Sequence, residues 1–477
     1  AGRAKYPFDR ILFANIGNPH ALGGVQPLTW PRQVMALVDL PDECGVDNAQ
    51  AQQMFPPDSI ARAKDMKQQL DGHGSGAYTH SKGVQAFRQD VANFITTRDG
   101  GVVPSNPDDI FLTNGASSGI EMILKALIAN PNSGVMIPVP QYPIYSATIT
   151  LLQGKCVGYR LDEENGWALN AKELERSYQE AVVRQGIDVR ALVVINPGNP
   201  SGSVLTRQNL HEVVQFCSKH NLVLLADEVY QENVYSNSIE HQFISCKRAA
   251  YEMGLLGDSS NTMNSQPSLE LVSFHSTSKG VIGECGRRGG YMELVGIDGA
   301  VKEELYKLVA CASLCGTNGQ IMTSLMVRGP KPGDASYESH EQEKQSNWES
   351  LKRRSEIVYQ GLNAIPGFSC QPAMGAMYCF PKLDLPPKAI QAAHAQGVTP
   401  DTLYALSLLE RTGICVVPSS GFELQDQSQQ GVGDDSDIHP RKARYGFRMT
   451  FLLNDNEMTE AVQKIRLHYE AFCQEYS

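Results

Sequence analysis

Short apolar segments recur through the middle of the chain, and each is followed by polar or turn-forming residues. They cover residues 110–113, 135–137, 191–195, 222–226 and 271–274. Continuous apolar strands of this length are typical of strands buried on both faces of a sheet. Segments with helical composition, such as 117–128 and 206–220, alternate with them. The pattern predicts an α/β fold with a mainly parallel sheet covered by helices.

The two ends of the chain lack the regular alternation of apolar and helical segments seen in this middle part. We expect residues 1–76 to form an N-terminal arm and part of a small domain, 77–330 a large domain, and 331–477 the rest of a smaller α+β domain. A Pro- and Gly-containing stretch at 330–334 predicts the hinge between them. Residues 424–443 are polar and rich in Gln and Asp, which predicts a surface loop.

Composition excludes several classes of protein. The 477 residues carry 41 Lys and Arg against 52 Asp and Glu, a formal net charge of −11. This balance argues against nucleic acid as the main partner. Since 42% of residues are hydrophobic, a disordered chain is excluded as well. The apolar runs are far shorter than the ~20 residues of a membrane span, so no membrane association is expected.

The cysteines predict a reducing compartment. There are eleven, without a C-x-x-C pair, and such a pattern favours free thiols over disulfides or a metal site. A cytoplasmic location is therefore expected, and no secretory signal peptide opens the sequence. Because the first residue is not Met, a removed mitochondrial targeting segment stays open.

The segment 273–280 carries the sharpest chemical signal. Lys279 follows a predicted strand and a hydroxyl-rich turn with Ser276 and Ser278, and Arg287 comes shortly after. A neutral lysine can form a Schiff base with an aldehyde cofactor, and hydroxyls with an arginine suit a phosphate beside it. The alternative is a solvated loop lysine, which a lone S-x-S-K motif would favour.

Three further segments follow predicted strands. In 226–230, Asp227 could pair with a cationic ring nitrogen and Tyr230 could hydrogen-bond a ring oxygen, although an Asp here also caps helices. Residues 196–202 read equally well as a plain turn. Residues 114–119 lie at a strand-to-helix junction, where free amides bind phosphate or are simply capped.

Taken together, the order and spacing of these four segments resemble the pyridoxal phosphate (PLP) aminotransferases of fold type I. The resemblance covers nearly the whole chain and is closer to the alanine aminotransferases. Longer matching strings lie at 3–9, 14–19, 283–291, 330–334 and 412–418. It implies that 77–330 is a PLP-binding domain.

The resemblance also implies the roles of individual residues around the cofactor. Lys279 matches the Schiff-base lysine and catalytic base, and Asp227 matches the carboxylate that keeps the ring nitrogen protonated. Asn199 and Tyr230 match the groups that bond the phenolic oxygen of the ring. The remaining cofactor contacts fall on Tyr142, which stacks on the ring, and on Ala116, Ser117, Ser276, Ser278 and Arg287, which hold the phosphate. Arg288 is then the outward-facing neighbour.

Substrate and partner contacts follow in the same way. Arg448 matches the arginine that grips the substrate α-carboxylate, beside Asn199 and a backbone contact at Gly17. Tyr78 matches a tyrosine that reaches the phosphate of a neighbouring subunit, which implies a homodimer with shared active sites. No motif marks the group that reads the glutamate side chain, for which Arg32 and Arg288 are candidates.

The activity implied is a reversible ping-pong transfer of the amino group between L-alanine and 2-oxoglutarate, giving pyruvate and L-glutamate. Three alternatives stay open, of which the first two share the motifs. They are a glutamate:glyoxylate aminotransferase, a PLP lyase of the same fold such as the aminocyclopropane carboxylate synthase type, and a cofactor-binding regulatory module without catalysis.

Overall fold

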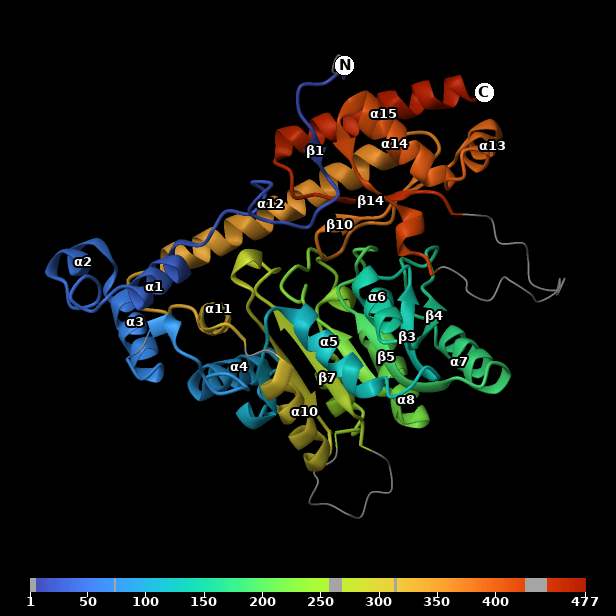
Figure 1. The fold of residues 1–477 in the computed structure, drawn as a ribbon. Coiled ribbons are helices and arrows are strands. Elements are labelled where there is room, and N and C mark those ends of the chain that lie inside the picture. The colour runs from blue at the N-terminus through green and yellow to red at the C-terminus, as the bar shows by residue number, and fades with distance from the viewer. Residues whose placement is uncertain (1–5, 73, 257–267, 313–314, 425–443) are drawn as a thin grey trace.

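The computed structural model describes residues 6–72, 74–256, 268–312, 315–424 and 444–477. A large helix-covered sheet forms one part, and a smaller group of strands and helices lies against one side of it (Figure 1). The loop expected at 424–443 lies outside the described residues apart from Leu424.

The large sheet has seven strands in the order β2-β8-β7-β6-β5-β3-β4. The strands are β2 (Ile110–Leu112), β3 (Ser133–Val139), β4 (Lys155–Arg160), β5 (Asp188–Ile195), β6 (Val223–Asp227), β7 (Leu271–Ser276) and β8 (Gly290–Val295). Neighbours pair in parallel except at β8, which is antiparallel to both β2 and β7. The predicted α/β class with a mainly parallel sheet is confirmed.

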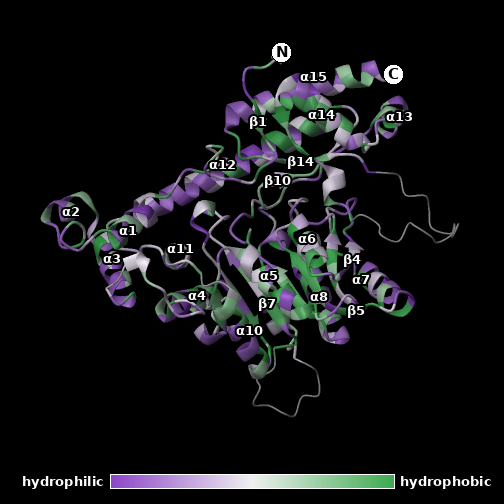
Figure 2. Ribbon diagram, viewed as in Figure 1, coloured by the Kyte–Doolittle hydropathy of each residue, from purple (hydrophilic) through white to green (hydrophobic). Residues whose placement is uncertain are grey.

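Helices cover both faces of this sheet. Alternate side chains such as Leu225 and Phe274 pack against α5 (Ala116–Leu127) and α6 (Pro143–Leu151) on one face. The opposite face, which includes Leu224, packs against α7 (Ala171–Gln179), α8 (Arg207–His220) and α9 (Cys246–Glu252). Hydrophobic colour concentrates on the strands and on the inner sides of these helices in Figure 2. The sheet is therefore buried on both faces, as its continuous apolar strands predict.

A separate helical cluster lies at the β2 edge. It consists of α1 (Thr29–Asp39), α3 (Pro57–Gln69), α4 (Gln85–Arg98) and α11 (Thr317–Val327), with α2 (Ala49–Met54) between α1 and α3 in the chain. Helix α10 (Gly299–Ala312) packs instead with α5. Side chains of α1, α3, α4 and α11 share one apolar core with Ile110 and Leu112 of β2. The α1–α3 group projects away from the sheet beside one end of α12 (Tyr337–Asn363), as Figure 1 shows.

The smaller part draws on both ends of the chain. Its helices are α12, α13 (Pro387–Ala395), α14 (Pro400–Thr412) and α15 (Asp455–Glu475). Its strands are β1 (Leu12–Phe13), β9 (Phe368–Ser369), β10 (Tyr378–Cys379), β11 (Lys382–Leu383), β12 (Ile414–Cys415), β13 (Val417–Pro418) and β14 (Phe447–Thr450). Strand β1 pairs in parallel with β12, whereas β14 lies between β10 and β13. The N-terminal segment is thus tied to the C-terminal part, and its next residues run on toward the large sheet.

Candidate active site

A cavity of about 220 Å³ lies where the carboxyl ends of the parallel strands meet. Most of the residues predicted for the cofactor line it, namely Ala116, Ser117, Tyr142, Asn199, Asp227, Tyr230, Ser276, Ser278 and Lys279. These residues come from loops and strand ends that are far apart in sequence. The parallel sheet brings them together because β5, β6 and β7 end at the same edge.

Asp227 is the last residue of β6 and is only 3% exposed. The Tyr145 hydroxyl donates to its Oδ2 at 2.9 Å, and the Val229 amide lies 3.5 Å from Oδ1. Burial raises the pKa of Asp227 to about 6, although these hydrogen bonds and the positive charge of Lys279 act in the opposite direction. The hydrogen bonds and Lys279 offset only part of the cost of burying this carboxylate. The carboxylate is therefore suited to a cationic partner placed in the cavity.

Lys279 stands in the turn that follows β7. Its Nζ donates to the Gly17 carbonyl at 2.9 Å and lies 5.6 Å from the centroid of the Tyr230 ring. Gly17 fits here because a Cβ would lie 1.8 Å from the Tyr378 hydroxyl oxygen and 3.1 Å from Lys279 Nζ. The N-terminal segment therefore passes directly over the predicted reactive amine, and the substrate contact expected at Gly17 stays a prediction.

An anion cradle forms at the start of α5. The Arg288 guanidinium donates from Nη1 to the Ser278 hydroxyl at 3.1 Å and from Nη2 to the Asn114 carbonyl at 3.0 Å. Gly115 precedes the helix at φ 76°, and a Cβ there would lie 2.4 Å from Arg288 Nη2. Free amides of a helix N-terminus, two hydroxyl side chains and a guanidinium are a donor set that binds phosphate.

The structure reverses the expected positions of Arg287 and Arg288. Arg288 lines the cavity, whereas the Arg287 side chain is 40% exposed and its Nε lies 3.9 Å from Glu284 Oε2. The cause is local backbone geometry, because the short turn Cys285–Arg287 ends at Arg288 in the left-handed region at φ 53°. This turn directs Arg288 back toward Ser278. The cradle is therefore completed by Arg288 and not, as the sequence had led us to expect, by Arg287.

Arg448 lies on β14 at the edge of the smaller part. Its Nη1 donates to Asn199 Oδ1 at 3.1 Å, and its Nη2 donates to the Asn15 carbonyl at 2.8 Å. The guanidinium also sits 4.3 Å from the centroid of the Tyr378 ring. Its Nε is buried without a hydrogen-bond partner among the described residues. A planar fork held this way, with donor capacity left over, fits a carboxylate.

Tyr378 was not among the residues predicted from the sequence. It lies on β10, is 3% exposed, and receives a 3.5 Å hydrogen bond from the Tyr230 hydroxyl. A tyrosine in a two-residue strand gives no local signal, since the partners of this one lie in other elements. Tyr145, whose hydroxyl donates to Asp227, was also missed, because its partner lies in another element.

Two other expected residues lie away from the cavity. Tyr78 is 94% exposed on a loop before α4 and does not line the cavity of its own chain. Arg32 bonds Glu284 at 2.6 Å and lies 3.3 Å from His20 Nδ1, also outside the cavity lining.

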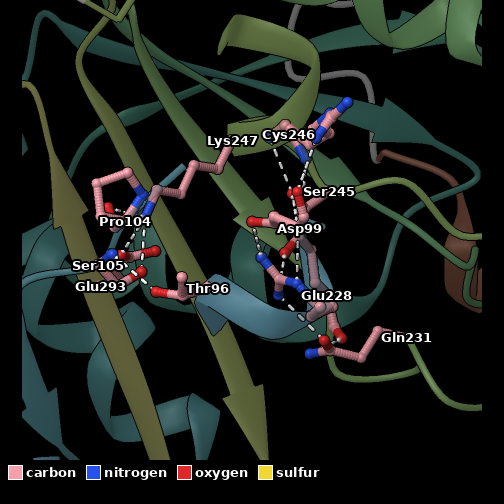
Figure 3. A network of polar contacts seen from close by, with 12 residues as sticks. Thr96, Asp99, Pro104, Ser105, Glu228, Gln231, Ser245, Cys246, Lys247 and Glu293 are labelled. Atoms are coloured by element: carbon pink, nitrogen blue, oxygen red, sulfur yellow. Dashed lines mark hydrogen bonds and ion pairs between the residues drawn. The ribbon is translucent and has the colours of Figure 1, made fainter. Parts of the chain in front are cut away.

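The opposite face of the sheet holds a buried polar network (Figure 3). Glu228 follows Asp227 and points to this face, where its Oε2 lies 3.4 Å from Arg98 and its Oε1 accepts from the Cys246 amide at 2.8 Å. Burial raises the pKa of Glu228 to about 7, and Arg98 opposes this. Further contacts join Arg98 to Asp99 and Gln231, Asp99 to Ser245, and Lys247 to Ser105 and Glu293. The network anchors α4 and α9 beneath the strand that carries Asp227.

Comparison with known proteins agrees with this site. Residues 47–465 match the profile of the aminotransferase class I and II family. A probable mitochondrial alanine aminotransferase of Dictyostelium discoideum is 44% identical over 475 residues, covering 100% of this chain and 83% of the relative. Glutamate–glyoxylate aminotransferase 1 of Arabidopsis thaliana is also 44% identical, covering 98% of this chain and 90% of its own. The chain belongs to the class I and II aminotransferases.

A solved structure agrees with the fold. The alanine aminotransferase of Pyrococcus furiosus superposes with a TM-score of 0.71 at 22% identity, covering 98% of this chain and 93% of its own. None of the described helices is long and apolar enough to cross a bilayer. In the described ranges, no cluster of His, Cys, Asp and Glu side chains is arranged to hold a metal ion.

The protein is a PLP-dependent aminotransferase, and the residues present fit that cofactor. Asp227 offers a buried carboxylate for the ring nitrogen, and burial raises its pKa to about 6 despite its two hydrogen bonds and the charge of Lys279. The absence of a side chain at Gly115 leaves room for Arg288 at the phosphate cradle. Lys279 lines the same cavity as these two groups.

Proposed function

We propose that the protein transfers an amino group reversibly between L-alanine and 2-oxoglutarate, giving pyruvate and L-glutamate. The observation that carries the proposal is the 44% identity to alanine aminotransferases over nearly the whole chain. The arrangement of Arg448 and Asn199 beside Lys279 supports it, because it offers a carboxylate fork next to the reactive amine.

Different residues of the cavity would bind different parts of the cofactor. Ser117, Ser276, Ser278 and Arg288 would hold the phosphate of PLP, Tyr142 would cover its ring, and Asn199 and Tyr230 would bond its phenolic oxygen. Asp227 would keep the ring nitrogen protonated. When bound in this way, PLP supplies an electron sink that stabilises negative charge at the substrate α-carbon.

Lys279 then works as the proton carrier of the reaction. Its Nζ takes the proton from the α-carbon of the amino donor and later returns a proton, acting as general base and then as general acid. Arg448 orients the donor through the α-carboxylate, so that the α-hydrogen faces Lys279. Because donor and acceptor use the same groups in turn, ping-pong kinetics are expected.

We further propose a homodimer in which Tyr78 contributes to the partner's phosphate site. Its exposure of 94% supports this, because a large aromatic side chain left open on a loop is suited to burial by a second copy. Tyr78→Phe should weaken PLP binding without changing the dimer mass in sedimentation. Unchanged PLP affinity would contradict the shared site.

The reaction is tested with a panel of donors and acceptors on the purified protein. Pyruvate should form from alanine over many turnovers only when 2-oxoglutarate is added, and Lys279→Ala should abolish its formation. Repeated turnover of an amino acid with a β leaving group, without any acceptor, would indicate a lyase instead.

A second candidate is a glutamate–glyoxylate aminotransferase, because relatives of that name reach 44% identity. It predicts that glutamate with glyoxylate is turned over faster than alanine with 2-oxoglutarate in the same panel.

For the compartment, we propose a reducing one, either the cytoplasm or the mitochondrion. None of the eleven cysteines forms a disulfide, and several alanine aminotransferase relatives carry mitochondrial names. Localising a fluorescent fusion of the full-length gene product tests the choice between them.

A further inference from the structure

Four polar groups meet where the N-terminal segment, β10 and the turns after β6 and β7 come together. The Tyr378 hydroxyl accepts a hydrogen bond from Tyr230 at 3.5 Å, and Lys279 Nζ donates to the Gly17 carbonyl at 2.9 Å. A Cβ on Gly17 would touch both Tyr378 Oη and Lys279 Nζ, at 1.8 and 3.1 Å. Both atoms therefore border the same small space above Gly17.

The Tyr378 ring is held firmly in this place. The Arg448 guanidinium lies over it at 4.3 Å from the ring centroid, and the Tyr230 ring meets it edge-on with centroids 6.1 Å apart. The residue is 3% exposed, so its side chain is largely shielded from bulk water.

We propose that Tyr378 is the proton-exchange partner of Lys279. In the cofactor-free protein the Tyr378 O–H bond breaks and an N–H bond forms on the neutral Lys279 amine, which leaves a phenolate beside an ammonium group. The reverse transfer returns Lys279 to the neutral base. No proton leaves the site and no other reactant is needed. The use of this exchange during turnover rests on the proposed transamination, but the pair itself does not.

The surrounding charges favour the transfer. Burial raises the pKa of Tyr378, but the charge that Lys279 carries once it holds the proton, the positive charge of Arg448, and hydrogen bonds from Tyr230 and Lys279 outweigh it, so the pKa is lowered. Burial and the neighbouring Tyr378 raise the pKa of Tyr230. Of the two phenols in contact, Tyr378 is therefore the one that gives up its proton.

Other elements packed around Tyr378 do not reverse this preference. Tyr142, at the start of α6, has a raised pKa through burial and through Tyr378 itself. On α12, which packs against β10, the charged group Arg354 donates to the Leu453 carbonyl at 3.0 Å.

Ultraviolet titration of the cofactor-free protein tests the pair. Phenolate absorbance should show one tyrosine that titrates below the ordinary range near pH 10. That step should disappear in Tyr378→Phe and move to higher pH in Lys279→Ala, where the neighbouring cation is lost. Tyr404→Phe is the matched control, because Tyr404 is fully buried with a raised pKa and should leave the step unchanged.

The outcomes separate this inference from the proposed reaction. A titration that is the same in wild type and in folded Tyr378→Phe would overturn the proton pair, even if transamination is normal. Should Tyr378→Phe fail to fold, the Lys279→Ala shift decides, and no shift would overturn the pair. A low-pH phenol step in a protein that transfers no amino group would support the pair and overturn the reaction.

Discussion

The Arg288 guanidinium donates a hydrogen bond to the Ser278 hydroxyl at 3.1 Å, one residue before Lys279. This contact joins the turn after β7 to the turn before β8 and closes the anion cradle at the start of α5. The adjacent Arg287 has no part in it and faces Glu284 instead. Two neighbouring arginines with different surroundings offer a matched pair for mutation.

Arg288→Gln should weaken PLP binding, because a charge-assisted contact to the phosphate is lost. Such a contact contributes about 1.5–3 kcal/mol, which corresponds to roughly 10- to 150-fold in the dissociation constant. Arg287→Gln should leave the constant within about twofold, in the range of ordinary surface substitutions. Equilibrium dialysis with PLP measures both, and equal losses in the two variants would refute the assignment of Arg288.

Arg448→Lys should raise KM for amino donors because lysine keeps the charge but lacks the planar fork. We expect roughly a 10- to 100-fold increase, with PLP affinity unchanged. Arg444→Lys is the control, since Arg444 also lies over an aromatic ring, at 4.0 Å from the Phe380 centroid, but pairs with Glu163. A similar KM for both variants would argue against a carboxylate site at Arg448.

Gly17→Ala should disrupt the site from the N-terminal side. The added Cβ would lie 1.8 Å from the Tyr378 hydroxyl oxygen, so this ring or the segment itself must shift. Displacement on this scale should lower kcat on the order of 100-fold. Gly76→Ala is the control, because a Cβ at Gly76 meets no atom within 4 Å. Normal turnover by Gly17→Ala would show that the close approach is not needed.

Asp227→Asn should abolish transamination yet stabilise the cofactor-free protein at pH 8. Burial raises the pKa of Asp227 to about 6, above its unfolded value near 4, so the folded state keeps its proton longer. Stability is therefore lost as pH rises from about 4 to about 6 and stays low above that. Asparagine avoids this loss, which amounts to at most about 3 kcal/mol.

Urea unfolding of the cofactor-free wild type and Asp227→Asn at pH 8 and pH 4 checks the sign of this stability difference. The variant should be the more stable form at pH 8, and the difference should nearly vanish at pH 4. A variant that is less stable than wild type at both pH values would contradict a strained, buried carboxylate.

The sequence predicted those site residues whose placement depends only on neighbouring residues in the chain. Asp227 and Lys279 directly follow buried strands, and the common edge of a parallel sheet brings such residues together whatever the loops do. Arg288 was misplaced because its direction depends on one left-handed φ angle, which spacing does not reveal. Tyr378 was missed because its contacts come from β14 and from the loops after β6 and β7. The two-residue strands β12 and β13 are separated at Val416, and a break of one residue is too short to show in the sequence pattern.

The contacts of the N-terminal segment with Lys279 and Arg448 have a consequence for synthesis on the ribosome. Gly17 and Lys279 are 262 residues apart, and Asn15 and Arg448 are 433 residues apart. The opening residues must therefore wait, unpaired, until β12 and β14 have been made. The reactive lysine is translated long before the arginine that would orient its substrate, so a nascent chain carries an unfinished pocket for most of its synthesis. Full assembly of the site becomes a late step, and products truncated before residue 448 would lack the guanidinium that binds the substrate carboxylate in the proposed reaction.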